Sequence, residues 1–79
     1  MYKSKTEAAT YQIKVKGWLD ESWAKWFDGL VISNEIEGDD PPVTVLTGPI
    51  VDQAALYGIL LKIQNLGLSL LAVNCLRRG

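Results

Sequence analysis

Residues 43–67 read VTVLTGPIVDQAALYGILLKIQNLG, and the turn residues inside this stretch decide the fold. The β-branched run 43–47 predicts a strand, which the Gly-Pro pair at 48–49 ends because proline cannot donate to a strand ladder. Asp52 then has the side chain of a helix N-cap, which accepts hydrogen bonds from free backbone N–H groups. Gly67 suits the left-handed conformation that commonly follows a helix end. The stretch therefore predicts a strand, a turn and a helix.

This helix has one apolar side. Residues at i, i+3, i+4 and i+7 spacing form its expected buried stripe, which consists of Leu56, Ile59, Leu60 and Ile63, extended by Leu66. Gly58 inside the helix indicates close packing against another backbone. Tyr57 lies at the edge of the stripe, and we expect its hydroxyl to reach solvent or a partner.

Three further segments, on either side of residues 43–67, have the residue pattern of a β-strand. Residues 11–16 alternate between apolar and polar, which predicts a strand with one buried face. Residues 31–37 show the same period, and the turn-rich segment 38–42 joins them as a hairpin to the strand that follows. Residues 68–76 are apolar at nearly every position, which is typical of a strand covered on both faces.

A second helix is predicted between the first two strands. Asp20 has the character of an N-cap, Glu21 suits the positive end of a helix dipole, and Gly29 suits the position after the helix end. Apolar side chains at helical spacing form a single stripe made of Trp23, Trp26, Phe27 and Leu30.

The element order is therefore strand, helix, strand, strand, helix, strand. In a chain of 79 residues this order predicts an α+β, ferredoxin-like βαββαβ fold, in which two helices cover one face of a four-stranded antiparallel sheet. We expect a flexible tail over residues 1–10, a single domain over 11–76 and a short basic tail over 77–79.

The other face of this sheet is left open, and we expect it to form an interface. The face assignments depend on strand parity. Tyr11, Ile13 and Val15 are expected in the core, opposite Gln12, Lys14 and Lys16. On the third strand, Val43 and Val45 are expected inward, opposite Thr44 and Leu46. On the last strand, either Leu71, Val73 and Cys75 or Leu70, Ala72, Asn74 and Leu76 are inward. The candidate interface residues are Trp18, Lys14, Lys16, Leu46, Leu70 and Leu76.

Composition excludes several functions. The chain has no histidine and one cysteine, so it lacks the commonest general base and zinc ligand and cannot form an internal disulfide. Its formal net charge of −1 argues against a nucleic-acid binder, which needs a basic excess. No apolar segment follows the N-terminus and no stretch suits a membrane span, so we expect a cytoplasmic location and no membrane partner.

The polar residues have structural explanations that leave no catalytic, metal or cofactor site. Asp20, Glu21 and Asp28 are expected to cap and solvate the first helix. The acidic residues of the hairpin lack the spacing of a calcium loop: Glu35, Glu37, Asp39 and Asp40. Cys75 is expected to be a small buried hydrophobe. We therefore expect no enzymatic activity and no cofactor.

Several motifs are similar to those of a known group of proteins. They include Tyr11 to Gly17, Trp26 to Leu30 and, as the most specific part, the Gly-Pro-x-Val-Asp-Gln-Ala-Ala-Leu stretch at 48–56. In these motifs the chain resembles short bacterial proteins of cyanobacteria and actinobacteria, a group with no established activity. The resemblance implies a single free-standing domain. Those proteins often have histidine at the position of Tyr57, so the tyrosine weakens a catalytic role there.

These observations predict a small non-enzymatic protein-interaction or regulatory module. It would act through self-association, as a homodimer, or through a protein partner. Trp18 is either a lid over the core edge or an interface anchor, since tryptophan is enriched in binding hot spots. The alternative is a small-molecule-sensing regulatory domain with its ligand at a dimer interface near Gly17, Trp18 and residues 48–49.

Overall fold

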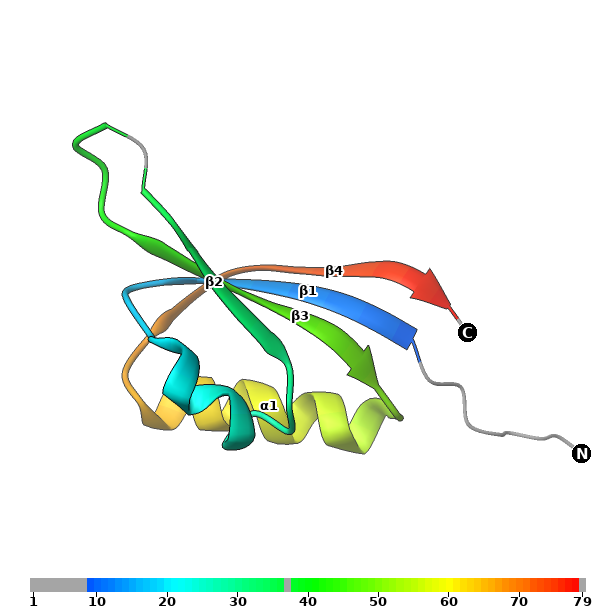
Figure 1. Cartoon of the computed structure of the whole chain (residues 1–79). Coiled ribbons are helices and arrows are strands. Elements are labelled where there is room, and N and C mark those ends of the chain that lie inside the picture. The colour runs from blue at the N-terminus through cyan, green and yellow to red at the C-terminus, as the bar shows by residue number, and fades with distance from the viewer. Residues whose placement is uncertain (1–8, 37, 79) are drawn as a thin grey trace, which may run out of the picture.

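The fold is α+β, with a four-stranded antiparallel sheet, one α-helix and one short 3-10 helix (Figure 1). The computed structural model describes residues 9–36 and 38–78. The elements are β1 (Ala9–Lys16), η1 (Glu21–Lys25), β2 (Val31–Glu35), β3 (Val43–Ile50), α1 (Gln53–Asn65) and β4 (Ser69–Arg78). The predicted class and the four-stranded antiparallel sheet are confirmed.

The strands lie in the order β2-β3-β1-β4. β1 pairs on one side with β3, where Ile13 lies opposite Leu46, and on the other side with β4, where Ile13 lies opposite Val73. β2 pairs only with β3, where Ile32 lies opposite Leu46. The two central strands are therefore β1 and β3, and the edges are β2 and β4.

The ferredoxin-like βαββαβ prediction is wrong in its first helix. In place of that helix the chain forms η1, five residues long. Asp28 and Gly29 both have positive φ, at 60° and 81°, so the backbone turns away only a few residues after Asp20. A segment this short is below the length at which an α-helix is stable without strong packing. Both η1 and α1 lie on the same side of the sheet (Figure 1).

Helix α1 begins and ends as its sequence predicts. The Asp52 carboxylate accepts a hydrogen bond from the backbone N–H of Ala55 at 2.8 Å. Leu66 is the C-cap, and Gly67 follows it with φ +79°. Leu56, Ile59 and Ile63 form the buried side of the helix. Within residues 9–36 and 38–78, no helix is long and apolar enough to cross a membrane.

The core lies between α1, η1 and one face of the sheet. Its largest fully buried side chains include Phe27 of the turn after η1, Ile13 of β1, Leu46 of β3 and Ile59 of α1. β1 therefore buries the predicted side. β3 does not, because Thr44 and Leu46 face the helices while the paired register places Val45 opposite Lys14 on the open face.

Strand β4 differs most from its prediction. It was expected to be covered on both faces, yet its aliphatic side chains are exposed: Leu70 47%, Leu71 51%, Val73 37% and Leu76 53%. Two register shifts, at Thr10/Tyr11 and Lys14/Val15, leave Leu76 and Leu71 without a partner on β1. The paired residues place Leu70, Val73 and Cys75 on the helix side, a set that neither predicted parity contains.

The first and last strands of the chain are longer than predicted. β1 begins at Ala9, which pairs with Ile50 and Arg78, and β4 continues through Arg77, which pairs with Thr10. Ala9, Thr10 and Arg77 are thus part of the sheet rather than of terminal tails. Residues 1–8 of the predicted N-terminal tail and Gly79 of the basic tail lie outside the described residues.

Candidate functional site

A buried polar network holds the loop that follows β1. The Thr44 hydroxyl accepts a hydrogen bond from the backbone N–H of Leu19 at 3.0 Å. Its single hydrogen serves one of two acceptors, the Gly17 carbonyl or the Asn34 side-chain carbonyl, each 2.7 Å away. Asn34 in turn donates from its amide nitrogen to the Leu19 carbonyl at 3.1 Å. Residues 17–19 are therefore tied to both β2 and β3.

This loop presents Trp18 to solvent. The Trp18 side chain is 55% exposed, whereas Leu19 beside it is buried. Gly17 packs so closely against the chain that a Cβ there would lie 2.8 Å from Leu68 Cδ2, and its N–H donates to the Pro42 carbonyl at 2.9 Å. Trp18 is thus an exposed aromatic side chain on a backbone that is fixed on both sides. It does not cover the core edge as a lid would.

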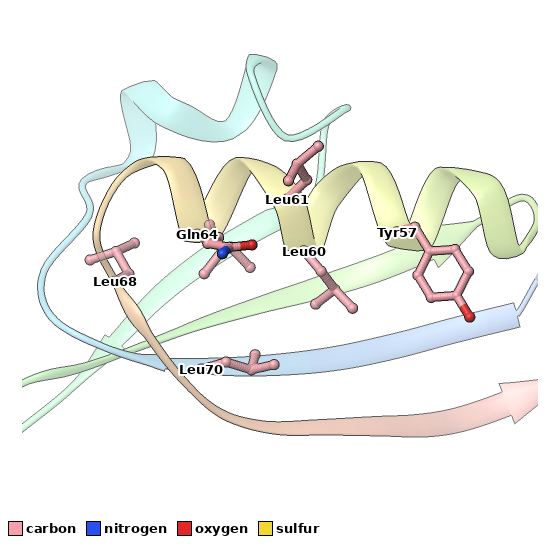
Figure 2. Close-up of a pocket in the computed structure, with 7 residues that line it drawn as sticks. Tyr57, Leu60, Leu61, Gln64, Leu68 and Leu70 are labelled. Atoms are coloured by element: carbon pink, nitrogen blue, oxygen red, sulfur yellow. The ribbon is translucent and has the colours of Figure 1, made fainter.

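An apolar groove opens between α1 and β4, next to the loop of Trp18. It has a volume of about 410 Å³. Its lining consists of Tyr57, Leu60, Leu61, Ile63 and Gln64 of α1, with Leu68 and Leu70. Tyr57 and Leu60 point from the helix toward the strands below (Figure 2). The groove exists because α1 packs over the central strands and leaves the helix side of β4 uncovered.

Strand β4 is also an unpaired edge. β1 occupies one of its sides, and no segment in the described part of the chain pairs with the other. The strand is ten residues long and contains neither proline nor lysine, two residues that commonly protect an edge. Its protective devices are two bulges, at Leu71 and Leu76, and Arg77 near its C-terminal end. Cys75 is exposed on this strand and is not the buried hydrophobe predicted.

Acidic and basic residues are unevenly distributed over the sheet, although Lys14 lines one hollow with Glu35 and Asp40. β1, α1 and β4 contain no aspartate or glutamate. On the open face beside β4 lie Lys14, Lys16 and Arg77. Exposed acidic residues of the described chain lie instead near β2, η1 and the start of α1: Asp20, Glu21, Asp28, Glu35, Asp39, Asp40 and Asp52.

An aromatic cluster formed by η1 and the turn after it has a structural role. The rings of Trp23 and Trp26 meet edge to face at 5.4 Å, and Trp26 meets Phe27 in the same way at 5.2 Å. Lys62 of α1 donates to the Trp26 carbonyl at 2.7 Å, and its ammonium lies 5.5 Å from the Trp26 ring centroid. These contacts connect η1 to α1 and stabilise the helix side of the molecule.

The predicted interface residues divide between two surfaces. Leu70 and Leu76 are exposed on β4, and Trp18 is exposed on its loop. Lys14 and Lys16 lie on the open face, as predicted. The prediction that Leu46 belongs to the interface is wrong, because its side chain is fully buried under the helices.

Sequence reasoning missed the groove. Its exposed members Tyr57 and Leu61 are large apolar residues outside the buried stripe of α1. That position was a usable signal, since neighbouring apolar residues exposed on one surface mark a contact site more often than single ones do.

The carboxylates have other roles. Asp52 caps α1, and Asp20 caps η1 by accepting from the backbone N–H of Ser22 at 3.0 Å and from the Ser22 hydroxyl. Among residues 9–36 and 38–78, no three His, Cys, Asp or Glu side chains are grouped so that they could hold a metal ion. The groove and the β4 edge therefore form the candidate site.

Comparison with known proteins gives one match. Residues 10–74 match a family described as "Domain of unknown function (DUF8691)". This range begins in β1, includes both helices and ends in β4, so it contains the groove and most of the exposed edge. No curated protein and no solved structure matches the chain.

Proposed function

The chain belongs to the DUF8691 family, and we propose that it acts as a non-enzymatic interaction module that binds a polypeptide along strand β4. The partner is either a protein or a second copy of the chain. The observation that carries this proposal is the unpaired, ten-residue edge strand with exposed aliphatic side chains.

The edge offers a row of backbone donors and acceptors to another strand. Addition of an extended segment to such an edge is a common recognition mode, in which main-chain hydrogen bonds give affinity and side-chain pockets give specificity. Leu70 and Val73 would contact the side chains of the added strand on the helix side of the sheet. Monomeric proteins seldom expose an apolar band of this kind without a use for it.

The groove and Trp18 supply further contacts beside the edge. The groove accepts apolar side chains that point toward α1 from the added strand. The Thr44 network holds the backbone on both sides of Trp18, at Gly17 and Leu19, so little backbone conformational entropy is lost when Trp18 is buried by a partner. Tryptophan residues are frequent binding hot spots.

A selection experiment tests the proposal. Random extended peptides displayed on phage are selected against the immobilised chain, and each binder is then measured against two variants. Val73→Lys places a charge on β4, and Val31→Lys makes the same change on β2, where Val31 is 67% exposed. We expect binders whose affinity falls at least tenfold with Val73→Lys and is unchanged with Val31→Lys.

Light scattering from 1 to 200 µM distinguishes a second copy from another partner. Self-association predicts a dimer mass that Val73→Lys returns to the monomer value and that Val31→Lys leaves in place. The proposal is contradicted if the chain stays monomeric and selects no peptide, or if both lysine variants affect binding equally.

The groove also supports small-molecule sensing as a second candidate function. Its volume of about 410 Å³ is within the range typical of ligand pockets, and the Tyr57 hydroxyl and Gln64 amide are polar groups on its lining. A thermal-shift screen of metabolites tests this role. A hit should raise the unfolding midpoint of the wild type and lose that effect in a Gln64→Leu variant, whereas a screen without hits contradicts the role.

A further inference from the structure

We infer that the polypeptide bound at β4 is an extended segment of another protein in which acidic and apolar residues alternate. This inference rests on the function proposed above. The charges and side-chain directions on the two faces of the sheet next to β4 are the observations that carry it.

The two faces of an added strand would meet different surroundings. Side chains on its helix side would face Leu70 and Val73 of β4 and the apolar groove under Tyr57. Side chains on its open side would face Ser69, Ala72 and Asn74 of β4, and also the exposed bulge residue Leu71, which lines a hollow of that face with Lys14. Successive strand residues point to opposite faces, so the segment should be apolar at every second position.

The positions between these apolar residues would meet positive charge. Lys14 is paired with Ala72, and Lys16 is paired with Ser69. Both β4 residues are small, so they leave room for the long lysine stems to extend across β4 toward a strand about 4.8 Å beyond it. Arg77 lies on the same face at the other end of β4. Carboxylates at the open-side positions would therefore lie among these three cations.

Acidic side chains reach this face from the β2 side, where Glu35 and Asp40 line a hollow together with Lys14 and Leu71. β1, β4 and α1 themselves contain no aspartate or glutamate, so the charge complementarity still favours an acidic segment.

A second copy of β4 would fit this edge poorly. If two β4 strands paired antiparallel about a two-fold axis, Arg77 of one copy would lie near the Ser69 end of the other, beside Lys16. Like charges placed side by side are destabilising. The charge pattern thus favours a different chain over self-pairing.

Fluorescence anisotropy with three labelled synthetic decapeptides tests this inference. In the first, valine alternates with glutamate, in the second with glutamine, and in the third with lysine. We expect the glutamate peptide to bind about tenfold more tightly than the glutamine peptide, with an advantage that decreases as salt increases, and the lysine peptide to bind least.

Two charge reversals separate a local effect from the net charge of the protein. Lys14→Glu should remove the preference for glutamate over glutamine. Lys25→Glu changes the net charge by the same amount on η1, away from β4, and should retain the preference. Circular dichroism confirms that both variants are folded.

Each result has a defined meaning. If the glutamine peptide binds as well as the glutamate peptide and Val73→Lys weakens both, the acidic partner is wrong and the interaction edge stands. If no peptide binds and the chain is a monomer, both proposals fail. If the chain is a dimer whose β4 amides are protected from hydrogen exchange, the occupant is a second copy and the inference is wrong.

Discussion

Thr44 is the residue on which the position of the Trp18 loop depends. Its side chain is fully buried and contacts three polar groups, on Gly17, Leu19 and Asn34. A threonine in a strand is usually assigned to the solvent face, which is why the faces of β3 were predicted the wrong way round. The hydroxyl is stable in the core because each of its hydrogen-bonding capacities is used.

Thr44→Val should therefore destabilise the fold although it preserves the shape of the side chain. The Leu19 N–H would remain buried without its acceptor, at a cost of about 1–3 kcal/mol in the free energy of unfolding. Thr47→Val is the matched control, because Thr47 lies on the opposite face and is only half-buried. Urea denaturation measures both variants, and equal effects would contradict the role of the network.

Alanine substitution should have opposite effects on stability at Gly48 and at Gly58. A Cβ on Gly48 would lie 2.8 Å from Leu30 Cδ2, and Leu30 is buried with little room to move. Gly48→Ala should thus destabilise the chain by about 1–3 kcal/mol. A Cβ on Gly58 would meet nothing within 4 Å, so the close packing predicted for this glycine is wrong. Gly58→Ala should stabilise α1 by about 0.5–1 kcal/mol.

Thermal and urea denaturation measure the stability of the Gly48→Ala and Gly58→Ala variants. A destabilising Gly58→Ala would show that the helix is strained or contacted at this position in solution. A neutral Gly48→Ala would show that Leu30 can move aside.

At the scale of elements, α1 and η1 have similar N-caps but different lengths, and the length decides which type of helix forms. Both begin at an aspartate whose carboxylate accepts a backbone N–H. α1 continues for thirteen residues before Gly67 ends it, whereas η1 is cut short by the left-handed backbone at Asp28. Capping signals therefore predict where a helix starts, but not whether the segment is long enough to be α-helical.

Asp52→Ala should weaken α1 by removing its N-cap. The Ala55 N–H would lose its acceptor, and we expect a loss of about 1 kcal/mol in the free energy of unfolding. Asp52→Asn should retain most of the stability, since asparagine is also a good N-cap. Hydrogen exchange of the first turn of α1 provides the measurement. Equal losses in both variants would mean that the carboxylate acts through its charge and not as a cap.

The strands show what alternation alone can predict. β1 follows its pattern, because a central strand in regular register keeps one face buried along its whole length. β4 does not, because two bulges change which residues share a face. Its continuous apolar pattern is also compatible with two different environments, a buried strand and an edge strand awaiting a partner. Only the order of the strands in the sheet distinguishes these two environments, and the local sequence of β4 does not determine that order.

At the scale of the whole molecule, the two edges of the sheet are protected differently. β2 is short, with five residues, and has acidic residues nearby. β4 is twice as long and has several exposed aliphatic side chains. The candidate site was predictable in part, through Trp18, the lysines of β1 and the leucines of β4. The groove was not, because it depends on where α1 packs over the sheet.

This asymmetry predicts which edge limits the behaviour of the isolated chain at high concentration. An exposed apolar edge strand is a template for aggregation. Val73→Lys should raise the concentration at which the chain aggregates at elevated temperature, whereas Val31→Lys on β2 should have little effect. Static light scattering during heating gives this measurement. Equal protection by both variants would mean that aggregation starts from the unfolded chain and not from the β4 edge.

The exposed thiol of Cys75 lies on this same edge strand, facing the helix side beside Val73. Its chemistry therefore reports on what occupies the edge. A strand bound along β4 should slow alkylation of the thiol, and a bulky adduct formed first should block that strand from binding. Since the chain has one cysteine, the rate of a single chemical reaction measures whether the edge is free.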